Sequence, residues 1–109
     1  MGFAVPAPKL PPQAKAAQKI KSRVDTLITK MQNNETFTPT REQLEDIAET
    51  TLDYISKNHF EITPHDSYLK AAVIDLTEVP VMAPQMQRIS FLVALKDASH
   101  EMELFLSCF

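Results

Sequence analysis

Between residues 13 and 32, apolar side chains recur at every third or fourth position. This spacing is typical of an amphipathic helix, because it places them on one face. The Asn residues of QNNE at 32–35 can end a helix in the left-handed conformation when glycine is absent. We therefore predict a helix over 13–32, with an apolar face that contains Ala16, Ile20, Val24, Leu27 and Met31.

A second apolar stripe follows the sequence FTPTREQL. Thr38 can cap a helix that has Pro39 at its first position, and Thr40 with Gln43 can form a capping box two residues later. The basic and cap-like sequence at 57–59 ends the pattern. We predict a helix over 39–57, with an apolar stripe formed by Leu44, Ile47, Ala48, Thr51, Leu52 and Ile55.

Residues 67–79, SYLKAAVIDLTEV, fit two structures. A helix that begins at Thr63 would bring Leu69, Ala72, Val73 and Leu76 onto one face. The β-branched residues of this segment are, however, typical of strands. A hairpin at the end of the chain would also need a third strand or a helix against it. We favour a turn at 63–67 and a strand near 70–78.

The end of the chain, RISFLVALKDASHEMELFLSCF, alternates apolar and polar positions in a way that favours a β-hairpin. Strands at 88–96 and 101–108 would be joined by a four-residue turn at 97–100. This register puts Leu92, Phe105 and Phe109 on the outer face. It puts a larger apolar set on the core face, namely Ile89, Phe91, Val93, Leu95, Met102, Leu104, Leu106 and Cys108.

These elements predict an α+β fold, in which the two N-terminal helices pack on a small C-terminal antiparallel sheet. The N-terminal segment has a different composition, with prolines at positions 6, 8, 11 and 12. Proline favours extended structure and removes backbone donors. We therefore expect a flexible arm over 1–12 and a single domain over 13–109.

The composition excludes several classes of site. A chain of 109 residues with one Gly cannot build the glycine-rich loops that bind nucleotide phosphates. Its one cysteine, Cys108, cannot form an internal disulfide, which suggests a reducing compartment. No apolar run approaches the length of a membrane span. We expect a soluble, cytoplasmic protein that does not act on a membrane.

Charge is distributed unevenly, although the net charge is only −3. Residues 1–32 carry a net charge of +5, and residues 33–109 carry −8. Lys15, Lys19 and Arg23 form a row at steps of four on the first helix. This row could bind phosphates, or it could pair with the acidic row of the second helix, which an antiparallel connection would bring close.

No group in the sequence has a recognisable activating partner. His59 and His65 lie near Asp66, but their spacing does not match a metal motif. Cys108 falls on the core face of the hairpin, so we expect an inert thiol. We predict that the protein is not an enzyme and uses no metal or cofactor.

The remaining interpretation is a small protein–protein interaction module, such as a regulator, an inhibitor or an assembly subunit. It would bind another protein or a second copy of itself through its basic N-terminal region or the outer sheet face. The alternative is a nucleic-acid-associated factor that uses the basic residues in 9–30. The candidate binding residues are Lys15, Lys19, Arg23, Leu92, Phe105 and Phe109.

Overall fold

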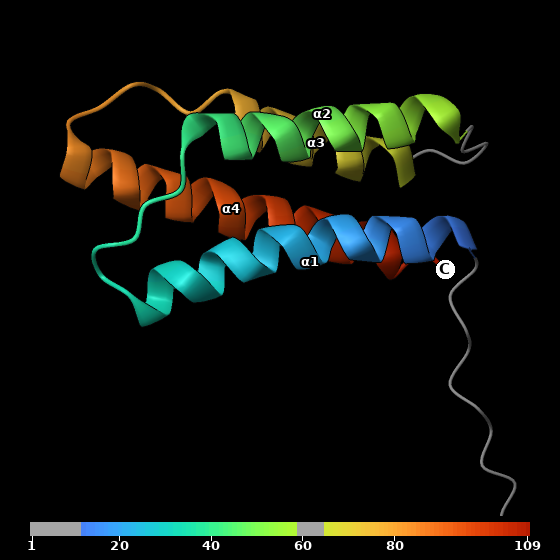
Figure 1. The fold of residues 1–109 in the computed structure, drawn as a ribbon. Helices are drawn as coiled ribbons and strands as arrows, with labels where there is room; N and C mark the ends of the chain where they lie inside the picture. Colours follow the sequence, from blue (N-terminus) through green and yellow to red (C-terminus); the bar gives the residue numbers. More distant parts are fainter. Residues whose placement is uncertain (1–11, 59–64) are drawn as a thin grey trace, which may run out of the picture.

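The computed structural model describes residues 12–58 and 65–109, and in these ranges it contains four α-helices and no strand (Figure 1). Their bounds are α1 Pro12–Asn33, α2 Arg41–Lys57, α3 His65–Thr77 and α4 Pro84–Leu106. The arm predicted at residues 1–12 lies outside the described residues, except that Pro12 begins α1.

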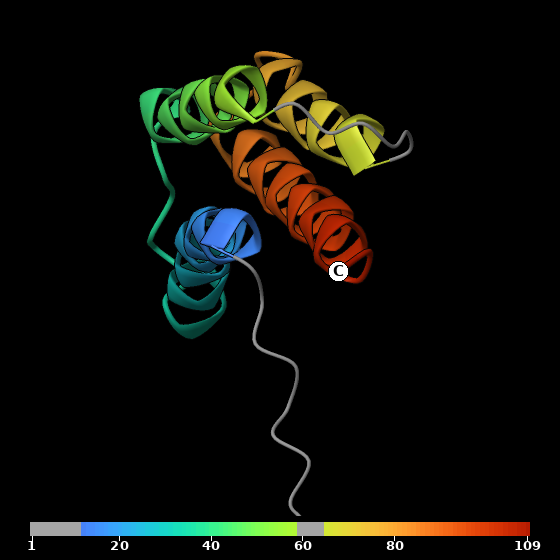
Figure 2. The same cartoon turned by 90° about the vertical axis from the view of Figure 1, so that its right-hand side faces the viewer.

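The helices form an antiparallel bundle in which each one reverses the direction of the one before it (Figure 1). The end-on view shows α4 beside both α1 and α3, with α2 beside α3 (Figure 2). The fourth pair of neighbours, α1 with α2, is the least closely packed. The start of α1 and the end of α4 lie at the same end of the bundle (Figure 1).

The prediction of an α+β fold is therefore wrong, and α4 explains why. Residues 88–108 bury a stripe with helical spacing, and the segment at 97–100 continues the helix instead of turning. That segment, DASH, contains neither Gly nor Asn, which tight hairpin turns use to reach positive φ. The buried side chains of α4 are Phe91, Ala94, Leu95, Ala98, Met102 and Phe105.

The strand predicted near 70–78 is also wrong, because α3 runs through it. The helical alternative for this segment is the correct one. Its β-branched residues are tolerated, since burial of a helical stripe outweighs their small difference in intrinsic propensity. The buried stripe is the one that a helix places on one face, namely Leu69, Ala72, Val73 and Leu76.

A single core runs between the four helices. Each helix contributes large side chains that are almost inaccessible to solvent. Tyr54 and Phe105 meet edge to face, with ring centroids 6.2 Å apart. Such an edge-to-face contact adds to the stabilisation from buried area. The largest fully buried side chains include Met31, Leu44, Ile47, Leu69, Leu76, Leu95, Met102 and Phe105.

The first two helices form close to the predicted positions. α2 begins with the capping box of Thr40 and Gln43, one of the two predicted starts. In this box the Gln43 side chain accepts a hydrogen bond from the Thr40 N–H at 2.8 Å. Two backbone donors that the helix would leave unpaired are thereby satisfied. The helix ends at Lys57, as predicted.

The end of α1 differs from the prediction of a left-handed cap, because no described residue has a positive φ. The guanidinium of Arg88 from α4 instead binds one carbonyl in the last turn of α1 and two carbonyls of the connection that follows. It donates hydrogen bonds to the carbonyls of Met31 at 2.6 Å, Asn34 at 3.3 Å and Phe37 at 3.2 Å. A cation at a helix C-terminus is also favoured by the helix dipole.

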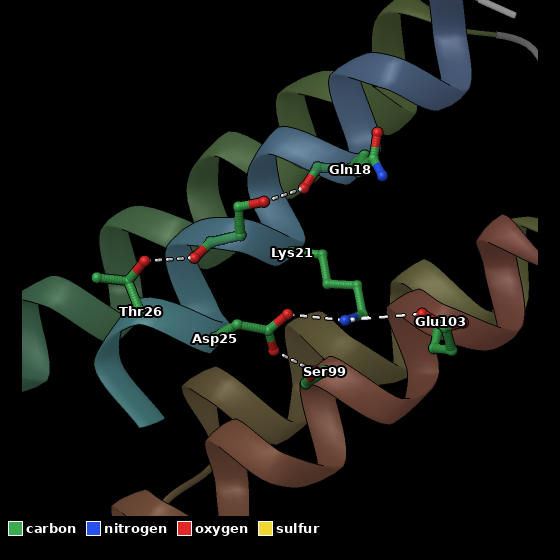
Figure 3. A network of polar contacts seen from close by, with 7 residues as sticks. Gln18, Lys21, Asp25, Thr26, Ser99 and Glu103 are labelled. Atoms are coloured by element: carbon green, nitrogen blue, oxygen red, sulfur yellow. Dashed lines mark hydrogen bonds and ion pairs between the residues drawn. The ribbon is translucent and has the colours of Figure 1, made fainter. Parts of the chain in front are cut away.

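A polar network joins α1 to α4 on the other side of the molecule from α2 (Figure 3). Asp25 receives hydrogen bonds from Lys21 at 2.7 Å and from the Ser99 hydroxyl at 2.5 Å. The Lys21 ammonium also lies 3.6 Å from Glu103. The hydrogen bond to Asp25 raises the pKa of Lys21. Ser99 and Glu103 thus connect α4 to α1.

Candidate functional site

Several large apolar side chains stay exposed on one side of the bundle. Met86, Ile89 and Val93 follow one another at steps of three and four, so they share a face of α4. Ile89 is 54% exposed and Val93 is 52% exposed. Contiguous exposed apolar surface often marks a binding site. With neighbours from α3 and the connection after it, we define the apolar strip as Ile74, Met82, Met86, Ile89 and Val93.

The strip borders a shallow groove between α3 and α4. This groove has a volume of about 460 Å³, and its lining includes Ile74, Met82 and Val93. Asp75, Glu78 and Asp97 line the same groove. The surface therefore places apolar side chains directly beside carboxylates.

The carboxylates of this surface form no ion pair with any described residue. Asp75, Glu78, Asp97 and Glu101 take part in none of the ion pairs found in the described part of the chain. Partial burial raises the pKa of Asp75, and the nearby charges of Asp97 and Glu101 raise it further. The local potential is therefore negative. We call the apolar strip together with these four carboxylates the α3–α4 face.

The structure does not bring together the three residues predicted for an outer sheet face. Phe105 is fully buried, and Leu92 is half-buried against the core. Phe109 is 43% exposed and contacts the Phe105 ring at a centroid distance of 5.2 Å. These positions differ because a helix turns each successive residue by about 100°, whereas a strand alternates them between two faces.

The predicted basic residues lie on α1. Lys15 and Lys19 are exposed, and Arg23 reaches across to α2. The guanidinium of Arg23 pairs with Asp46 and donates a hydrogen bond to the Thr50 hydroxyl at 3.2 Å. This contact is the cross-helix charge pairing that the sequence offered as one of two possibilities. Lys9 lies outside the described residues.

Other candidate chemistry is sparse among residues 12–58 and 65–109, where no group of three His, Cys, Asp or Glu residues could hold a metal ion. The predicted burial of Cys108 is wrong, because the residue is exposed and its thiol donates to the Leu104 carbonyl at 3.4 Å. His59 lies outside the described residues, so the proximity of His59 and His65 stays a prediction.

No protein family, curated protein or solved structure matches this chain. None of the helices in the described ranges combines the length and the apolarity needed to cross a bilayer.

Sequence reasoning missed the α3–α4 face. A helical projection of residues 84–106 would have revealed it, because Met86, Ile89 and Val93 fall outside the stripe that contains Phe91, Leu95 and Met102. The hairpin interpretation concealed this signal, since it assigned Ile89 and Val93 to the core.

Proposed function

We propose that this protein is a small helical interaction module that binds a basic, amphipathic segment of a partner protein on the α3–α4 face. The observation that carries the proposal is the position of the apolar strip beside four carboxylates that have no cation partner in the described part of the chain. A cytoplasmic location, suggested by the single cysteine, is part of the proposal.

The apolar strip supplies the affinity in this proposal. Burial of apolar surface is worth about 25 cal/mol per Å², and half of the surface of each strip residue on α4 is available. Met86 and Met82 have flexible side chains, which adapt to partners of different shape. The strip therefore resembles the apolar grooves that accept amphipathic helices.

The carboxylates supply the selectivity. A cationic side chain placed near Asp75, Asp97 and Glu101 would relieve their mutual repulsion, whereas an acidic segment would increase it. Nucleic acid is disfavoured on this face for the same reason. The nucleic-acid alternative would have to use α1, where Arg23 and Lys21 are already paired with carboxylates.

The shape of the groove between α3 and α4 favours a helical partner. α3 and α4 are antiparallel neighbours (Figure 2), and the groove runs between them. A third helix can seat its ridge of side chains in such a groove. Its apolar residues would contact Ile74, Ile89 and Val93, while lysines or arginines at its edge would face the carboxylates.

The test uses two labelled amphipathic peptides of about 18 residues, one built from Leu and Lys and the other from Leu and Glu. Fluorescence anisotropy should show saturable binding of the Lys peptide and much weaker binding of the Glu peptide. Combined Ile89→Ser and Val93→Ser substitutions should weaken binding of the Lys peptide at least about tenfold, because they remove the centre of the strip.

Leu52→Ser is the matched control, because Leu52 is an equally exposed apolar residue on α2, away from the α3–α4 face. It should leave binding unchanged. Equal binding of both peptides, or an equal effect of the control, would contradict the proposal. Sedimentation velocity adds a further outcome. A homodimer dispersed by Ile89→Ser and Val93→Ser would show that a second copy, and not a basic partner, occupies the face.

A further inference from the structure

A second hollow lies between α1 and α2, on a different side of the bundle from the α3–α4 face. It has a volume of about 600 Å³ and opens between the first half of α1 and the last half of α2. Its apolar lining includes Ile20 and Tyr54, which are buried, and Ala16, which is exposed. We call this hollow the α1–α2 groove.

The groove lies at the loosely packed seam between α1 and α2. Ala16 on α1 and Thr50 on α2 both line it, and both have small side chains. The contact of Arg23 with Asp46 and Thr50 ties the seam together at one end of the groove. Ile20 and Tyr54 also line the groove and present a small apolar surface to it, since each is 7% exposed.

The rim of the groove carries more positive than negative charge. Lys19, Arg23 and Lys57 line it, and Asp53 is the one carboxylate among its described lining residues. Lys57 pairs with Asp53 at 2.9 Å, but both side chains are largely exposed, so this pair is weak. Lys19 has no ion pair in the described part of the chain.

The start of α1 adds to this positive potential. Pro12 lines the groove, and the first turn of the helix has no acidic residue. The amino end of a helix carries a partial positive charge, which an acidic residue of the first turn commonly offsets. The first turn of α1 carries no such residue.

We propose that the α1–α2 groove binds a small amphiphile with an apolar tail and a single anionic head group. The tail would lie on Ala16, Ile20 and Tyr54, and a carboxylate, sulfonate or phosphate head would lie at Lys19. This site is independent of the α3–α4 face and differs from it in the sign of its charge and in the class of its ligand.

The experiment titrates the full chain, labelled with ¹⁵N, with dodecanoate below its micelle concentration and follows amide chemical shifts. Saturable shifts should concentrate on α1 and α2 around Ile20 and Thr50. Dodecyltrimethylammonium should produce much smaller shifts there, and acetate should produce none, which separates the contribution of the tail from that of the head.

Two pairs of variants localise the site. Lys19→Glu should weaken dodecanoate binding about tenfold, whereas Lys15→Glu, which changes an exposed lysine outside the lining, should alter it less than about twofold. Ala16→Leu should fill the groove and abolish binding, whereas Gln18→Leu, at an exposed position of the same helix, should not. Circular dichroism would verify that all four variants fold.

Four results would overturn the proposal. The first three are a lack of saturable binding by the full chain, equal binding of the cationic amphiphile, and shifts that concentrate on α3 and α4. The fourth is unchanged binding by folded Ala16→Leu, which would exclude the groove as the site.

Discussion

Arg88 connects three parts of the bundle through one guanidinium group. It lies in the first half of α4 and donates hydrogen bonds to backbone carbonyls at the end of α1 and in the connection that follows. The planar fork of a guanidinium can reach several acceptors at once, which an ammonium group cannot do in the same geometry. The register between α4 and α1 therefore depends on this residue.

Arg88→Ala should lower the free energy of unfolding by about 1 to 3 kcal/mol, since it leaves partly buried carbonyls without a donor. Arg88→Lys should recover only part of this loss. Lys96→Ala, at an exposed position on the same helix, should change stability by less than about 0.5 kcal/mol. Urea denaturation would measure all three, and equal losses for Arg88→Ala and Lys96→Ala would show that the carbonyl contacts are not stabilising.

Phe105 lies in the core, whereas the predicted hairpin placed it on the outer face of a sheet. Because it is fully buried and packs against Tyr54, Phe105→Ala should cost about 3 to 5 kcal/mol. Phe109→Ala removes a partly exposed ring, so it should cost less than about 1.5 kcal/mol. Thermal melts of the two variants would check the order, and comparable losses would place Phe105 outside the core.

The free energy of unfolding should depend on pH through the protonation of Asp75. Its pKa is raised above the ordinary value of 3.8, so the folded state binds the proton more tightly than the unfolded state does. Ionisation of Asp75 therefore lowers the free energy of unfolding. This loss of stability is fully present at neutral pH, and it disappears as the pH falls from the raised pKa towards 3.8.

Asp75→Asn should therefore raise Tm at neutral pH by about 2 °C, and this advantage should shrink as the pH is lowered. Glu49→Gln, which removes a charge from the exposed face of α2, is the control and should show no such trend. A stabilisation by Asp75→Asn that is the same at every pH would mean that charge is not its cause.

At the scale of elements, the sequence predicts α1 and α2 well and mispredicts α3 and α4. The first two helices have one apolar stripe each and polar residues elsewhere, so the helical period is unambiguous. In α4, residues 89–95 are almost all apolar, and such a run satisfies the periods of a strand and of a helix together. The lack of Gly and Asn at 97–100 was the local evidence against the hairpin.

Substitutions at His100 can distinguish helix α4 from the predicted hairpin by experiment. It is an exposed position inside α4, where Ala is more favourable than Gly by about 1 kcal/mol. In a hairpin turn the preference would be reversed, since Gly relieves strain at positive φ. His100→Ala should therefore be more stable than His100→Gly in a denaturant titration, and the reverse order would support the hairpin.

For the whole molecule, we expect unfolding in a single transition. The chain has no Trp, so fluorescence reports Tyr54 on α2 and Tyr68 on α3, both of which contact the core. Far-UV circular dichroism reports all four helices. The two midpoints in urea should coincide, because α4 packs against both α1 and α3. A difference between the two midpoints would show that part of the bundle unfolds separately.

The candidate sites also follow from the whole molecule and not from local sequence. The charge asymmetry was visible in the sequence, but the α3–α4 face depends on which side of α4 is left uncovered. The α1–α2 groove depends on how closely two helices approach. The spacing along α4 shows which of its residues fall outside the core stripe, but whether those residues are covered, and how closely α1 and α2 approach, is set by packing between elements.

The position of α4 has a consequence for the chain as it is synthesised. Among the four described helices α1 is made before the others, yet its main partner, α4, is made after them. At 5 to 20 residues per second, translation of residues 34–106 takes roughly 4 to 15 s. During that interval α2, once it has been made, is the one other described helix that packs against α1, and it does so weakly. A chaperone that binds exposed apolar helices would find its substrate in this nascent intermediate.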